Sequence, residues 1–221
     1  MVELVASETE LTTAATDLVL AGLCALLARG LLRPGPGGGY RARLWGGVFA
    51  LLGGASLLGA VAHGLALDAG VRDLLWHPLY LALGLAIGLF AVGAVLDRWG
   101  EPVARRLLPA ALVAGGLFYA VAQWQGGAFW VFLGYQALAL LFALGSYLGL
   151  GRHGRLPGAW LLVTGIALTL LAALVQASGL ELTLGWRLDH NGLFHLLLVP
   201  GLGCLAAGVR RGPAPPRGGR S

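Results

Sequence analysis

Three histidines near the ends of two apolar runs are the residues best suited to chemistry. His63 lies near the end of one run, and His190 and His195 lie at the start of the last run. A catalytic zinc ion uses three protein ligands of this kind and keeps its fourth position for water, whose pKa it lowers toward about 7. If the two run ends meet, the residue types predict a zinc site held by His63, His190 and His195.

The start of the last run leaves the choice of one ligand open. Asn191 and His195 are four residues apart and share a helix face, whereas His190 would point about 140° away from His195 in a continuous helix. For His190 to reach the same point as His195, it must lie in a non-helical entry turn, with Asp189 as an N-cap. His190, Asn191 and Asp17 therefore remain alternatives for completing the site.

Three further polar residues could act beside such a metal ion. Ser56 lies two helical turns before His63 and so shares its face, where its hydroxyl could orient a ligand or a developing oxyanion. Asp73 follows His63 by ten residues, enough for the chain to turn back, and Asp17 is the deepest acid of the first run. We expect Asp73 or Asp17 to accept a proton there.

The elements that position these residues follow from the composition of the 221-residue chain. Hydrophobic residues make up 57% and charged residues 11%, with a mean hydropathy of +0.79, whereas a soluble domain carries about 25% charged residues. The apolar residues form runs of about the length that crosses a bilayer, roughly 20 residues. Such runs must satisfy their own backbone hydrogen bonds, which predicts helices.

Seven such runs predict an all-α integral membrane protein, a bundle of seven transmembrane helices. The single membrane domain covers residues 1–211, and residues 212–221 form a flexible tail. The fourth run is the shortest, and the orientation of all later runs depends on it. The expected spans are Thr12–Leu32, Leu44–Leu67, Leu74–Leu96, Leu107–Ala122, Phe129–Leu150, Pro157–Ala177 and Asn191–Val209.

Arginine placement predicts the orientation, because cytoplasmic loops collect positive charge. With the N-terminus outside and the C-terminus inside, thirteen of the fifteen arginines face the cytoplasm, and only Arg72 and Arg187 lie outside. The pI near 9.9 is then explained by contact with anionic lipids, without a nucleic-acid partner. The absence of lysine and the Gly, Ala and Leu content indicate a bacterial inner membrane. The oligomeric state does not follow from the sequence.

At these residues the chain resembles the CREST superfamily, which includes alkaline ceramidases and progestin and adiponectin receptors. That family's pattern has a serine and a histidine in the second helix, an aspartate near the start of the third and a pair of histidines at the start of the seventh. The matching residues here are Ser56 and His63, then Asp73, then His190 or Asn191 with His195. Two positions depart from it: Gly59 stands where the family has its serine, four before the histidine, and Asn191 stands where it has the first histidine of the terminal pair.

The resemblance implies a zinc-dependent hydrolase that cleaves an amide or ester bond of a lipid-like substrate, which enters from the outer leaflet. A non-enzymatic sensor or small-molecule carrier that uses the same polar pocket is the main alternative. A retinal protein of the usual kind is excluded, because the chain has no lysine for a Schiff base. Gln136 and Gln176 lie inside spans, where they either bond between helices or line a cavity.

Overall fold

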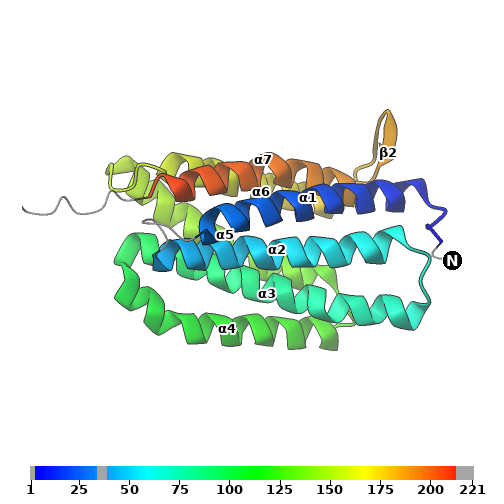
Figure 1. The fold of residues 1–221 in the computed structure, drawn as a ribbon, viewed down its shortest axis with the longest axis horizontal. Coiled ribbons are helices and arrows are strands. Elements are labelled where there is room, and N and C mark those ends of the chain that lie inside the picture. The colour runs from blue at the N-terminus through cyan, green and yellow to red at the C-terminus, as the bar shows by residue number, and fades with distance from the viewer. Residues whose placement is uncertain (1–2, 34–38, 213–221) are drawn as a thin grey trace, which may run out of the picture.

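The computed structural model describes residues 3–33 and 39–212. Seven helices lie in these ranges, and each is long and apolar enough to cross a membrane. The tail predicted for residues 212–221 lies outside the described residues from residue 213 onward. The helices are α1 (Glu8–Leu32), α2 (Tyr40–Gly64), α3 (Ala69–Trp99), α4 (Glu101–Trp124), α5 (Phe129–Arg152), α6 (Ala159–Ser178) and α7 (His190–Arg210) (Figure 1).

The fourth helix is longer than its apolar run suggests. α4 has 24 residues because the helix continues through polar residues on both sides of that run. It starts directly after α3, and the two are separated only by Gly100, whose φ of 88° favours glycine. Close packing then holds the pair together, since a Cβ on Gly84 would lie 2.6 Å from the Gly115 carbonyl oxygen.

A short β-hairpin between α6 and α7 was not expected from the sequence. Strands β1 (Leu182–Leu184) and β2 (Trp186–Leu188) pair antiparallel around Gly185, whose φ is 80°. The hairpin projects from the same end of the bundle as the N-terminal residues (Figure 1). This end also holds the start of α7, so the hairpin lies beside the predicted site.

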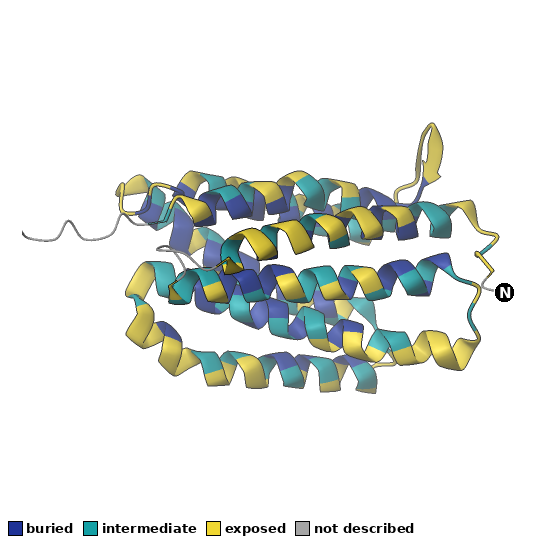
Figure 2. Ribbon diagram, viewed as in Figure 1, coloured by how far each residue is buried: buried dark blue, intermediate teal, exposed yellow. Residues whose placement is uncertain are grey.

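Six of the helices form a closed ring. In order around it, α1, α2, α3, α5, α6 and α7 each contact the next, and α7 contacts α1 again. α4 lies outside this ring against α3 and α5, and much of its surface is exposed, whereas α3 is the most buried helix (Figure 2). The ring encloses the space in which a site can form.

Opposite the hairpin, the end of the bundle where α2 begins is joined by a buried ion pair. Arg41 of α2 donates from Nε to Asp97 Oδ1 of α3 at 2.6 Å and from a second nitrogen to Oδ2 at 3.0 Å. The Tyr147 hydroxyl of α5 donates to the same Oδ2 at 3.0 Å, and Arg41 also donates to the Val209 carbonyl of α7. Four helices are therefore joined at this end.

Candidate functional site

A cavity of about 910 Å³ lies inside the ring. It runs from Trp45, which is fully buried, to Asp73 and Gln123 at the hairpin end, and its walls are mostly apolar. All of the predicted site residues lie along it, although they come from four different helices: Asp17, Ser56, His63, Asp73, His190 and His195.

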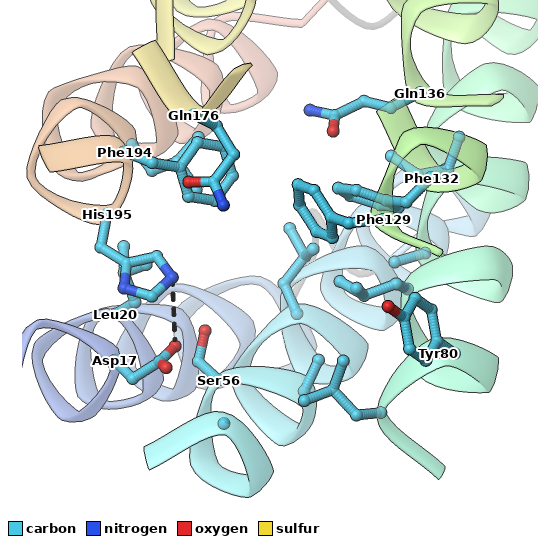
Figure 3. A pocket seen from close by; sticks show the side chains of 18 of the residues that line it. Asp17, Leu20, Ser56, Tyr80, Phe129, Phe132, Gln136, Gln176, Phe194 and His195 are labelled. Carbon is cyan, nitrogen blue, oxygen red and sulfur yellow. Dashed lines mark ion pairs between the residues drawn. The ribbon is translucent and has the colours of Figure 1, made fainter. Parts of the chain in front are cut away.

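A buried polar group at the cavity wall is formed by one residue from each of three helices (Figure 3). Asp17 Oδ1 of α1 lies 3.5 Å from His195 Nε2 of α7. The Ser56 hydroxyl of α2 points toward the same carboxyl group (Figure 3). Asp17 is only 4% exposed, so the group is removed from bulk water. We refer to Asp17, Ser56 and His195 as the inner cluster.

The hydrogen bonds of His195 define which of its nitrogens carries a proton. The Thr16 hydroxyl donates to the Thr13 carbonyl at 2.8 Å, so at its 3.1 Å contact with His195 Nδ1 it can only accept. Nδ1 therefore carries a hydrogen, and Nε2 faces Asp17. A bare ring nitrogen would repel a bare carboxylate at this place, so a proton on either atom would favour the 3.5 Å contact between His195 Nε2 and Asp17 Oδ1.

A second polar pair lies nearer the hairpin end. His63 Nδ1 of α2 is 2.6 Å from Glu10 Oε2 of α1, and the His63 ring also meets the Trp76 ring edge-on at 5.5 Å. Glu10 precedes Asp17 by seven residues, and Ser56 precedes His63 by seven. Because α1 and α2 run antiparallel, this equal spacing pairs Glu10 with His63 and Asp17 with Ser56. Sequence reasoning missed the first pairing, although the matching intervals could have revealed it.

The predicted zinc site would have to bridge these two layers. Within residues 3–33 and 39–212, no group of three His, Cys, Asp or Glu side chains is arranged to hold a metal ion. A zinc site held by His63, His190 and His195 therefore stays a prediction.

The beginning of α7 differs slightly from expectation. Asp189 is the N-cap and accepts from the Gly192 amide at 2.9 Å, which confirms the predicted cap. The helix begins at His190 itself, one residue earlier than expected, so His190 occupies its first turn. Its side chain faces the cavity without joining the inner cluster.

Asp189 anchors a chain of hydrogen bonds beside the cavity. Its Oδ1 also accepts from the Thr13 hydroxyl at 3.0 Å, and its Oδ2 accepts from Asn191 Nδ2 at 3.1 Å. Burial opposes ionisation of Asp189, but the bonds from Gly192, Asn191 and Thr13, together with nearby His190, lower its pKa below the usual value. Asn191 Oδ1 in turn accepts from Gln176 Nε2. Asn191 thus acts as a link between α6 and α7.

The last predicted site residue, Asp73, and the neighbouring His77 lie at the hairpin end of the bundle. Asp73 is exposed at the start of α3 and lines the mouth of the cavity, away from the inner cluster. His77 Nδ1 lies 3.0 Å from the Tyr119 hydroxyl of α4. Asp17, rather than Asp73, is therefore the carboxyl group that the structure places beside His195.

Comparison with known proteins gives one match. No curated protein and no solved structure matches the chain, so the resemblance to the CREST superfamily stays a prediction. A family model described as "Family of unknown function (DUF6962)" matches residues 12–214. Of the seven helices, this range leaves out only the start of α1, and it includes every residue of the inner cluster. The chain therefore belongs to the DUF6962 family.

Proposed function

We propose that this protein is a membrane-embedded binding protein, a sensor or a carrier, whose cavity takes a small amphiphile. The observation that carries the proposal is the cavity of about 910 Å³, mostly apolar, with the buried inner cluster at its wall. This volume is in the range of small-molecule sites, about 300–1,000 Å³. The apolar walls suit a hydrocarbon chain, and the inner cluster suits a polar group.

The inner cluster supports binding rather than helix packing alone. An ionisable group at membrane depth costs at least about 2.5 kcal/mol, and such groups generally mark functional sites. The Asp17 carboxyl group, the His195 ring and the Ser56 hydroxyl together offer both donors and acceptors. A hydroxyl or amide group of the ligand could satisfy them without carrying a net charge into the membrane.

Binding of 1-O-decylglycerol to the detergent-purified protein, followed by native mass spectrometry, tests this proposal. Ser56→Phe fills the space beside Asp17 and should abolish binding. Leu57→Phe adds similar bulk one residue further on, where the side chain is 53% exposed on the outside of the bundle, and should bind like the parent. Failure of the folded parent to bind, or equal binding by both variants, would overturn the proposal.

A zinc-dependent hydrolase acting on a lipid amide or ester is the second candidate. It is favoured by the presence of three histidines, His63, His190 and His195, along one cavity with carboxyl groups. Zinc, once bound, would supply an activated water and polarise a carbonyl group. Because the three side chains do not converge as arranged, this candidate requires them to move together before zinc can bind.

Metal content separates the two candidates. Purified protein incubated with zinc and then desalted should retain about one zinc per chain if the hydrolase proposal holds, as measured by elemental mass spectrometry. His195→Ala should lose that zinc, and His77→Ala should keep it. A folded parent without stoichiometric zinc would contradict the hydrolase proposal and leave the binding proposal in place.

A further inference from the structure

Gln136 of α5 is a buried polar residue that the inner cluster does not use. Its side chain lines the cavity and is 4% exposed, and its Oε1 has no hydrogen-bond partner among the described residues. Figure 3 shows it directed into the cavity, across from Asp17 and Ser56. A buried amide oxygen without a partner costs free energy, so this residue does not serve packing alone.

Gln176 of α6 also lines the cavity and holds the same kind of unpartnered atom, and the hydrogen-bond chain from Asp189 establishes the orientation of its amide group. The ionised Asp189 can only accept, so Asn191 must direct its Nδ2 toward it and its Oδ1 toward Gln176. Gln176 then donates from Nε2, so Oε1 is the amide atom that this bond leaves free. This Oε1 is also buried and has no partner among the residues described.

We propose that Gln136 and Gln176 form a second polar subsite, which accepts hydrogen bonds from hydroxyl or amide N–H groups of the bound amphiphile. This inference rests on the proposed binding function and narrows its ligand class. Both free atoms are acceptors, so the ligand must carry donors in addition to the group held by the inner cluster. An amphiphile with a single acceptor group, such as an ether or a simple ester, leaves both oxygens unsatisfied.

A matched pair of probes isolates the contribution of the ligand's hydrogen-bond donors to binding. 1-O-decylglycerol carries two hydroxyls, and its 2,3-di-O-methyl derivative keeps the oxygen acceptors but has no donor. Neither contains an ester, so neither is consumed by hydrolysis. The parent should bind the diol roughly tenfold more tightly, which corresponds to one or two net hydrogen bonds.

Leucine substitutions test whether the glutamines cause that preference. In Gln136→Leu and Gln176→Leu, the ratio of the two dissociation constants should fall toward one. Gln125→Leu provides the matched control, because Gln125 is exposed at the end of α4 and does not line the cavity; its ratio should equal that of the parent. A tenfold ratio that persists in both cavity variants would overturn the subsite.

The thermal stability of the ligand-free protein adds a second readout. Gln136→Leu should melt no lower than the parent, because it removes a buried oxygen without a partner. A clearly lower melting temperature would assign the amide to packing and contradict the proposal. Equal binding of both probes by the parent would reject the subsite but retain the binding function, whereas binding of neither would reject both.

Discussion

Asp17 can approach Ser56 because Gly59 has no side chain. A Cβ at Gly59 would lie 3.1 Å from Asp17 Cγ and only 2.6 Å from its Oδ2, a distance that real Cβ contacts essentially never show. The carboxyl group of α1 thus occupies the space that a side chain at this position would need.

We predict that Gly59→Ala displaces the Asp17 carboxyl group and lowers the free energy of unfolding by about 1–3 kcal/mol, the usual cost of overpacking. Gly54→Ala in the same helix is the control, since nothing lies within 4 Å of its new Cβ. It should be neutral or stabilise the helix by up to about 1 kcal/mol. Thermal unfolding in detergent measures both, and equal shifts would show that Gly59 is not closely packed.

The lowered pKa of Asp189 predicts how the stability of the protein depends on pH. Its pKa is lowered in the folded state, so its contribution is present above the unfolded pKa of about 3.9 and is lost as pH falls toward the folded value. Asp189→Asn lacks the charge at every pH. The melting temperature of the parent should exceed that of the variant by a constant amount above about pH 5, and this difference should shrink below about pH 4. A difference that does not vary with pH would contradict this role.

At the scale of the elements, Asp97 joins helices that are distant in the sequence. Its carboxylate side chain is 1% exposed and is held by Arg41 of α2 and Tyr147 of α5, while Arg41 also reaches α7. Burying these charges is costly, and their mutual geometry compensates for it. The ring is therefore closed at this end by polar contacts, whereas its cavity extends toward the other end.

Removal of that carboxylate should leave Arg41 without its charge partner. We expect Asp97→Ala to lower the free energy of unfolding by about 3–5 kcal/mol, as when one member of a buried pair is lost. Glu101→Ala breaks the exposed pair with Arg105 and should cost under about 1 kcal/mol. Unfolding in detergent mixtures compares the two, and similar costs would mean that Asp97 contributes no more than a surface pair.

For the whole molecule, the arginine distribution predicts that the hairpin end faces outward. A membrane-impermeant maleimide tests this prediction in intact bacterial cells that express the protein. In a background with Cys24→Ala and Cys204→Ala, Thr183→Cys in the hairpin should be labelled directly, and His153→Cys after α5 only after permeabilisation. Both positions are exposed, so the reverse labelling pattern would contradict the predicted orientation.

The sequence by itself determined seven apolar helices, the gathering of three histidines at one end of the bundle and the N-cap at Asp189. These features depend on local composition and on spacing along one chain segment. The interval from Glu10 to Asp17 equals the interval from Ser56 to His63. This equality also predicts the two layers of polar pairs, but only once α1 and α2 are known to be neighbours.

Only the tertiary structure decided the position of α4 outside the ring, the pairing of Asp17 with His195 and the lining of the cavity by Gln136 and Gln176. The reason is that hydropathy defines the length of a span but not its rotation or neighbours. These depend on close contacts between small residues and on hydrogen bonds between helices, such as Asp97 with Arg41. Two residues on different helices therefore form a site only when that packing determines their depth in the bundle and the direction of their side chains.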